Sequence, residues 1–231
     1  DDPELISFLQ SKGMPVENAG ELRTYIEDHI LRPAAEGILN GAIHGNEGFR
    51  QALAMSIALV LDDYSDTHPN SKDMVDYTYH GGGHSAYIMV NALRRDGGGH
   101  ESPSYNRIKT DFIRVAQLME QLRSRHPEEY PLDTYPDLFS TDKARSMFDF
   151  FIDIYVQGRY SPSIGDTGGI RAPRRLEPRN YSFIPENTLY AFNRWADPRY
   201  ARAISRHDGS LHAGNVFEPY PEEEIRKVLE D

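Results

Sequence analysis

The sequence predicts an all-α protein, arranged as an incomplete (α/α) toroid in which helical hairpins follow one another around a ring. Three observations lead to this prediction. Apolar residues recur at three- and four-residue spacing along most of the chain, strand-like alternation is essentially missing, and loops of glycine and polar residues separate the helical segments. We expect the 231 residues to form a single toroid domain or a fragment of one.

The N-terminal helices have clear start and stop signals. Pro3 suits the first turn of a helix, and Gly13 is a typical helix end. A longer helix should begin at Asn18 or Gly20, since both residue types are common at helix starts. Pro33 should kink or divide this helix, because proline lacks an N–H donor and its ring collides with the preceding turn.

The next segments surround a glycine-rich interruption. Residues 49–63 are apolar around most of the circumference of a helix, so we expect an interior helix there. A helical turn over residues 73–79 and a helix over residues 85–94 should follow. The sequence HGGGH at 80–84 should separate them, because glycine is a poor helix former.

The second half of the chain repeats the pattern. We predict helices at residues 105–125, 143–156, 187–206 with a break near Asp197-Pro198, and 221–230. Residues 158–185 are rich in glycine, proline and arginine. A loop of this length inside a compact domain is commonly functional.

The composition limits the possible partners and chemistries. A formal net charge of -11 and a pI near 5.3 argue against general affinity for nucleic acid or an anionic membrane surface. The longest apolar run, residues 53–61, is too short to cross a bilayer. The absence of cysteine excludes disulfides and thiolate chemistry. The chain begins at Asp1 without a signal-like segment, so we expect a mature chain or an excised fragment. From the charge and composition we expect no nucleic-acid or membrane partner, and we expect no cofactor or metal.

The stretch DGGGHESPSYN at 96–106 is the strongest candidate for a functional loop. Its three glycines exclude regular helix or strand, while His100 and Glu101 offer hydrogen-bonding side chains. Pro103 favours extended backbone before it, and Ser104 is a suitable N-cap, which places Tyr105 in the first turn of the helix that follows. At that position Tyr105 either presents a catalytic hydroxyl or simply packs on its neighbours. The sequence of the loop alone does not distinguish these two interpretations.

A second polar loop, HGNEG at 44–48, leads into the apolar segment at 49–63. The N-terminus of that helix should direct His44, Asn46 and Glu47 at whatever cavity lies at that end. Asn46 also has a simpler interpretation as the N-cap of the helix.

Two other chemistries fit short motifs but lack their context. HGGG forms oxyanion holes in esterases of the α/β-hydrolase type, yet the chain has neither a G-x-S-x-G nucleophile motif nor parallel strands. His80 and His84 have the spacing of metal ligands on a helix, but three glycines between them disfavour a helix and no HExxH is present. We favour neither an esterase nor a zinc site.

Three stretches together resemble the heparinase II/III-type polysaccharide lyases, a family related to the alginate lyases. They are His44-x-x-Glu47 at a helix entrance, DGGGHESPSY at 96–105 before a helix, and SIGDTGG at 163–169. They occur in the family's order, and the similarity extends from about Ala19 to Asn215.

The resemblance implies a fold, a location and catalytic residues. It implies a periplasmic or secreted (α/α) toroid that binds acidic polysaccharide in a cleft against a C-terminal β-sandwich domain, which this chain is expected to lack. The tyrosine after the glycine loop is the family's catalytic acid or base and corresponds to Tyr105. The family's first-helix histidine and glutamate correspond to His44 and Glu47. Many relatives have an asparagine near that entrance, and Asn46 is the residue available for that part. A later catalytic histidine of the family lies on the β-sandwich side, and we expect this chain to end before it.

The residues suit the chemistry of a lyase. A lyase removes the C5 proton of a uronic acid and expels the 4-oxygen substituent, so the neighbouring carboxylate must be neutralised. Asn46 and His44 can donate to that carboxylate. Tyrosine has an ordinary pKa of about 10, so Tyr105 acting as a base needs a cationic neighbour, for which His44, His100 and Arg107 are candidates.

We therefore predict β-elimination on a uronate-containing polysaccharide. Tyr105 and His44 are the expected catalytic residues, and the expected substrate-binding residues are Asn46, Glu47, His100, Glu101, Arg107 and Arg171. Two alternatives stay open. A glycoside hydrolase would need two facing carboxylic acids, for which Asp96, Glu101 and Asp166 are available. A non-catalytic carbohydrate-binding helical domain would need no catalytic group.

Overall fold

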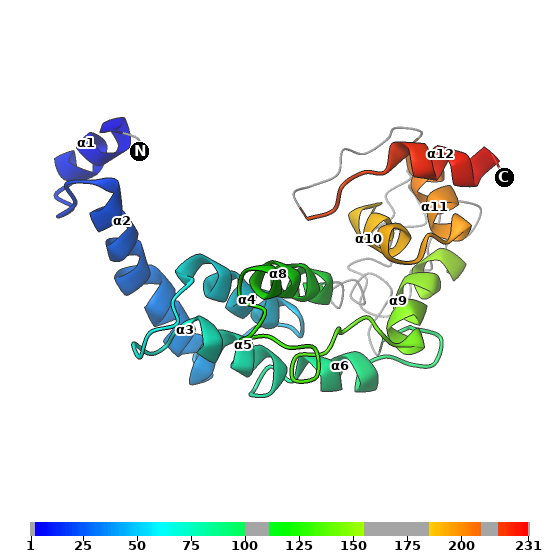
Figure 1. Cartoon of the computed structure of the whole chain (residues 1–231), viewed down its shortest axis with the longest axis horizontal. Helices are drawn as coiled ribbons and strands as arrows, with labels where there is room; N and C mark the ends of the chain where they lie inside the picture. The colour runs from blue at the N-terminus through cyan, green and yellow to red at the C-terminus, as the bar shows by residue number, and fades with distance from the viewer. Residues whose placement is uncertain (1–2, 100–110, 155–184, 209–216, 231) are drawn as a thin grey trace, which may run out of the picture. The chain divides into compact units, whose positions relative to one another are not determined.

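The computed structural model describes residues 3–99, 111–154, 185–208 and 217–230, and all regular structure within these ranges is helical (Figure 1). The prediction of an all-α protein is confirmed, whereas the incomplete (α/α) toroid stays a prediction. The chain forms two compact units. The first comprises Asp1–Asn46 and Arg50–His84, and the second comprises Glu47–Phe49 and Ser85–Asp231.

The first unit begins with three helical segments that follow the predicted boundaries. Helix α1 spans Pro3–Ser11, and Gly13 after it has a φ of 81°, a conformation that favours glycine. Helix α2 spans Ala19–Ile26, and Asn18 is its N-cap, since its Oδ1 accepts the Glu21 N–H at 3.0 Å.

The chain then forms a π-helical turn, η1 (Glu27–Leu31), before α3 (Arg32–Leu39). The Arg32 N–H donates to the Glu27 carbonyl, one residue further back than in an α-helix. Pro33 lies in the first turn of α3, where its missing N–H is tolerated. The sequence predicted a break at Pro33, and the structure shows that the break takes the form of a widened turn just before it.

Helix α4 (Phe49–Leu61), from Arg50 onward, and helix α5 (Ser71–Tyr79) complete the first unit. Ser71 Oγ joins them by donating to the Ala58 carbonyl at 2.8 Å. The core of this unit consists of apolar residues from α3, α4 and α5: Ala35, Ile38, Ala54, Met55, Ile57, Ala58, Leu61, Met74 and Val75.

The expectation of an interior helix at 49–63 is wrong for α4. One side is buried, but Phe49 and Val60 are 58% and 57% exposed. The apolar composition of a helix shows which of its faces can be buried. The packing of neighbouring helices then determines which of those faces are buried.

Helix α5 is longer than the helical turn predicted at 73–79 because a capping box starts it at Ser71. Asn70 Oδ1 accepts the Asp73 N–H at 3.0 Å, while Asp73 Oδ2 accepts the Asn70 N–H at 2.9 Å. Two backbone donors at the helix start are thereby satisfied.

An ion pair joins α3 to the segment after α4. Arg32 donates from its guanidinium to Asp63 Oδ2 at 2.6 Å and to the Pro69 carbonyl at 2.8 Å, and both side chains of the pair are mostly buried. The hydrogen bond from Arg32, with a further one from the Ser65 backbone, holds the pKa of Asp63 below its ordinary value.

This lowered pKa gives a testable pH dependence. A carboxylate with a depressed pKa stabilises the folded state above its unfolded pKa, and that contribution is lost as the pH falls through the folded value. We expect Asp63→Asn to lower the free energy of unfolding by about 1–3 kcal/mol near neutral pH and by much less in acid, where the wild-type carboxyl is protonated. Urea unfolding at a series of pH values measures this difference. The exposed Asp66→Asn is the control, and an equal loss for both variants would contradict the prediction.

The second unit is also helical. It contains α6 (Ser85–Asn91), α8 (Asp111–Arg125), α9 (Asp142–Asp153), α10 (Pro185–Trp195), α11 (Pro198–Asp208) and α12 (Glu222–Glu230). The helices predicted at 143–156 and 221–230 are confirmed with small shifts of their ends, and α6 ends before the predicted residue 94. The start of the helix predicted at 105–125 lies outside the described residues.

The break predicted near Asp197-Pro198 separates α10 from α11. Ala196 has a φ of 49°, and Pro198 begins α11. Helices α10 and α11 contact each other and α9, and α12 contacts α11 (Figure 1). An aromatic cluster fills this packing, with Phe148 in ring contact with Phe139, Tyr190 and Trp195 at centroid distances of 5.3–6.0 Å.

No helix among the described residues has the length and apolar character needed to cross a membrane.

Candidate functional site

The polar loop at 44–48 lies directly before α4. His44, Asn46 and Glu47 are all exposed. Because α4 begins at Phe49, Asn46 lies two residues before the N-cap position, and its side chain makes no hydrogen bond within the described part of the chain. The interpretation of Asn46 as a plain N-cap is therefore wrong, and its amide is available to a ligand.

The HGGGH loop at 80–84 folds back on the end of α5. The N–H groups of His80 and Gly81 donate to the Asp76 carbonyl, each at 2.8 Å, and that of Gly83 donates to the Tyr77 carbonyl at 2.9 Å. An oxyanion hole needs N–H groups that point at a ligand. Since carbonyl groups of α5 already accept from these three donors, the N–H groups of His80, Gly81 and Gly83 do not form an esterase-type oxyanion hole.

The glycines of this loop have a packing role instead. A Cβ atom on Gly83 would lie 2.7 Å from the Tyr77 carbonyl oxygen, and one on Gly82 would lie 2.9 Å from Tyr77 Cε2. Gln51 Nε2 donates to the Gly83 carbonyl at 2.9 Å from a fully buried position. The three glycines let the backbone lie against α5, where an added Cβ atom would collide.

No group of three or more His, Cys, Asp or Glu side chains within the described ranges is arranged to hold a metal ion. His84, one of the two histidines spaced like metal ligands, has a φ of 40°, so the pair does not share a regular helix.

The first part of the candidate catalytic loop is held against α9. Gly97 is buried with a φ of 83°, and a Cβ atom there would lie 1.8 Å from the Ser146 carbonyl oxygen. The Arg94 N–H donates to the Gly98 carbonyl at 2.7 Å, and the Gly98 N–H donates to Asp96 Oδ1 at 3.0 Å. The backbone at 96–98 is thus fixed by a tight turn and by contact with another helix.

The same contacts bear on the hydrolase alternative. Asp96 was one of the carboxylic acids available to a glycoside hydrolase, and its Oδ1 accepts the Gly98 N–H within the turn. This is the common use of aspartate in a turn, where the side chain takes the place of a backbone acceptor. The other two carboxylic acids, Glu101 and Asp166, lie outside the described residues.

Several predicted site residues also lie outside the described ranges. These are Tyr105, His100, Glu101, Arg107 and Arg171. The convergence of Tyr105 with His44, Asn46 and Glu47 on one cleft therefore stays a prediction.

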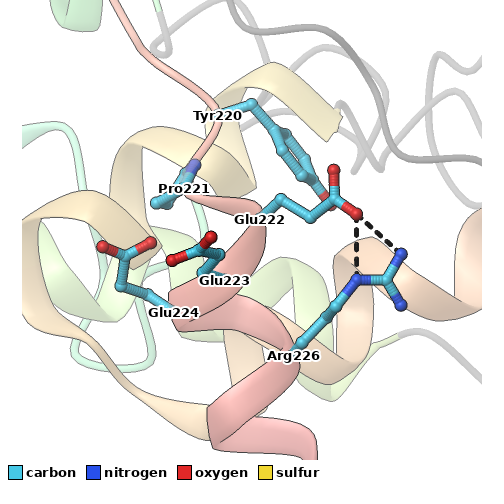
Figure 2. Close-up of a pocket in the computed structure, with 6 residues that line it drawn as sticks. All are labelled: Tyr220, Pro221, Glu222, Glu223, Glu224 and Arg226. Atoms are coloured by element: carbon cyan, nitrogen blue, oxygen red, sulfur yellow. Dashed lines mark hydrogen bonds and ion pairs between the residues drawn. The ribbon is translucent and has the colours of Figure 1, made fainter.

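A surface hollow of about 520 Å³ lies at the start of α12. It is lined by Tyr220, Pro221, Glu222, Glu223, Glu224 and Arg226 (Figure 2). Figure 2 shows the Glu222 carboxylate turned toward Arg226, whose Nε donates to Glu222 Oε1 at 2.9 Å, whereas the Glu224 carboxylate points away from that pair. Three glutamates repel an anionic polysaccharide, and the one arginine is paired, so this hollow does not suit the predicted substrate.

A buried carboxylate that carries no sequence signal links three parts of the second unit. Glu218 is 7% exposed and accepts from Gln117 Nε2 on α8 at 2.9 Å and from Asn193 Nδ2 on α10 at 2.8 Å. Desolvation raises the pKa of nearby Glu120, as does the charge of Glu218, while Arg194 opposes the shift. The amide donors satisfy Glu218 internally, as expected for a structural group that anchors the segment before α12.

Arg50, in the first turn of α4, was also missed by the sequence motifs. Its Nε is buried and has no hydrogen-bond partner among the described residues, and its guanidinium lies over the ring of Tyr77 with Cζ 5.9 Å from the centroid. No pattern in the sequence identifies this arginine, because the residues that pack around a donor in the folded structure determine whether it finds an acceptor.

Comparison with protein-family models, with curated proteins and with solved structures finds no match for this chain.

Proposed function

We propose that this protein is a polysaccharide lyase that cleaves a uronic-acid-containing acidic polysaccharide by β-elimination. The fixed turn at 96–98 is the observation that favours this proposal most. It holds the chain against α9 just before the stretch in which the resemblance places the catalytic tyrosine. A catalytic group needs such a rigid base, because small displacements of a reacting group reduce the rate strongly. The all-α architecture and the exposed loop at 44–48 also agree with the proposal.

In the proposed reaction Tyr105 takes part in proton transfer. The C5–H bond of the uronate breaks and its proton passes to a base, the C4=C5 double bond forms, and the bond from C4 to the leaving oxygen breaks. The leaving oxygen then receives a proton. Asn46 and His44 donate hydrogen bonds to the uronate carboxylate, where negative charge develops as the C5 proton leaves. Glu47, His100, Glu101, Arg107 and Arg171 are proposed to position the substrate.

An ultraviolet assay of the intact protein against a panel of acidic glycans tests the proposal. The conjugated double bond of the product absorbs where the substrate does not. A rise in absorbance that accompanies new reducing ends is the expected result. New reducing ends without this absorbance would identify a hydrolase, and binding without cleavage would identify a carbohydrate-binding domain. Either outcome would overturn the lyase proposal.

The Asn46 side chain offers a sharp test of carboxylate neutralisation. We expect Asn46→Ala to lower turnover at saturating substrate by about 100-fold, the usual effect of removing one donor to a developing charge. Its stability should be unchanged, because the side chain is exposed and makes no hydrogen bond in the described structure. Initial rates and urea unfolding measure the two quantities.

The control for this variant is Asn40→Ala. Asn40 is another exposed asparagine, and it accepts the Ala42 N–H at 2.9 Å in the turn after α3. This variant can lose a little stability but should keep full turnover. Equal turnover in the Asn46 and Asn40 variants would remove Asn46 from the site.

A further inference from the structure

Arg50 differs from the other partly buried arginines of the described chain. Arg32, Arg145 and Arg194 each form an ion pair with an aspartate. Arg123 donates to the backbone carbonyls of Tyr130 and Tyr135. Arg50 forms no ion pair within the described ranges, although the protein has 36 acidic residues against 25 lysines and arginines. A lack of carboxylates in the protein does not explain this.

The Arg50 head group is held in place on one side. Its guanidinium lies over the face of Tyr77, a favourable cation–π arrangement. Tyr77 is itself buried and lies against the backbone of Gly82, so it provides a firm base. The residue as a whole remains partly exposed, and a ligand can therefore reach it.

The Nε group is buried and has no hydrogen-bond partner within the described ranges. Arginine stays protonated under all ordinary conditions, so this donor carries charge in a place that water does not reach. A ligand does not reach this buried atom, so it meets the exposed part of the guanidinium, which shares the same delocalised charge. The planar guanidinium suits groups with two oxygen atoms in one plane, such as a carboxylate, or two oxygens of a sulfate.

We propose that Arg50 binds an anionic group of an acidic saccharide, a carboxylate or a sulfate, next to the polar loop at 44–48. The identity of the ligand rests on the proposed lyase function, whereas the need for an anion rests on the Arg50 geometry. Arg50 belongs to the same unit as His44 and Asn46 and follows Asn46 by four residues. It is a binding residue that selects charged over neutral saccharides.

The anion is tested first on the wild-type protein by nuclear magnetic resonance of arginine Nε–H groups. Arg50→Lys identifies the Arg50 signal by its disappearance. We titrate sodium glucuronate and sodium sulfate, with sodium chloride at equal ionic strength as the control. The expected result is a saturable shift of the Arg50 signal that chloride does not cause. A shift with glucuronate alone assigns a carboxylate, and a shift with sulfate alone assigns a sulfate ester. No shift with either anion overturns the proposal.

The saccharide is tested by binding measurements on variants. We expect Arg50→Gln to weaken binding of acidic oligosaccharides by roughly 10- to 100-fold, with no change for neutral ones. Arg50→Lys should lose part of this affinity, because lysine keeps the charge without the planar pair of donors. The control is Arg23→Gln, an exposed arginine of the same unit that pairs with Glu27. Unchanged affinity in Arg50→Gln, with or without lower stability, would make Arg50 a packing residue and overturn the proposal.

These outcomes separate the two proposals. A wild-type protein that shifts its Arg50 signal with anions but forms no unsaturated product would retain the anion site and lose the lyase function. A protein that forms the product with unchanged KM in Arg50→Gln would retain the lyase function and lose the anion site. The wild-type resonance experiment does not depend on the folding of the Gln variant.

Discussion

Tyr105→Phe is expected to abolish β-elimination while the protein stays folded. The substitution removes one hydroxyl and keeps the aromatic ring, so the expected loss of stability is about 1 kcal/mol or less. A proton-transfer group contributes roughly 10²–10⁴-fold to the rate, and removal of the hydroxyl removes that contribution. Initial rates from ultraviolet absorbance and unfolding curves of the same preparation measure both effects.

The matched control is Tyr87→Phe. Tyr87 is 68% exposed on α6 and belongs to none of the three motifs, so its variant should cleave like the wild type. Full activity of Tyr105→Phe would remove the tyrosine from the mechanism. Experimental coordinates that place its hydroxyl far from His44 and Asn46, with no cleft joining them, would end the assignment whatever the motif similarity.

Gly97→Ala is expected to be the most destabilising substitution among the glycines of the candidate loop. The φ of 83° disfavours any residue with a Cβ atom by about 1–2 kcal/mol. The added carbon would also lie 1.8 Å from the Ser146 carbonyl oxygen and 2.5 Å from the Met147 nitrogen. Both are backbone atoms of α9 and cannot rotate away. We expect a total loss of about 4 kcal/mol or more, at the extreme of single-substitution effects, together with loss of elimination activity.

Gly13→Ala separates backbone strain from collision. Gly13 has a φ of 81°, and a Cβ atom there would meet nothing within 4 Å. Its variant should therefore show the cost of the backbone conformation alone, about 1–2 kcal/mol. Urea unfolding of both variants gives the comparison. Equal losses would mean that the turn at 96–98 is not held against α9, and the rigid base of the proposed catalytic loop would disappear with that contact.

Local sequence signals were sufficient for most of the helices. The Asn18 cap, the division of the second helix near Pro33 and the break at Asp197-Pro198 all depend on residues within one turn of the feature. The same is true of the absence of strands among the described residues, because the spacing of apolar residues is a local property. Local signals failed where a neighbour decided the outcome, as for the two exposed apolar residues of α4.

The candidate site shows the same division. Motifs and their order were sufficient to predict four candidate site residues, because polar groups next to helix starts are visible in a sequence: His44, Asn46, Glu47 and Tyr105. The sequence by itself thus determined an all-α chain and a set of candidate residues. The tertiary structure alone decided that Gly97 lies against a backbone 49 positions later, that HGGGH packs on Tyr77, and that the Arg50 Nε lacks a partner in the described part of the chain. These facts depend on distances between residues remote in the chain, and packing sets such distances only when the whole fold forms.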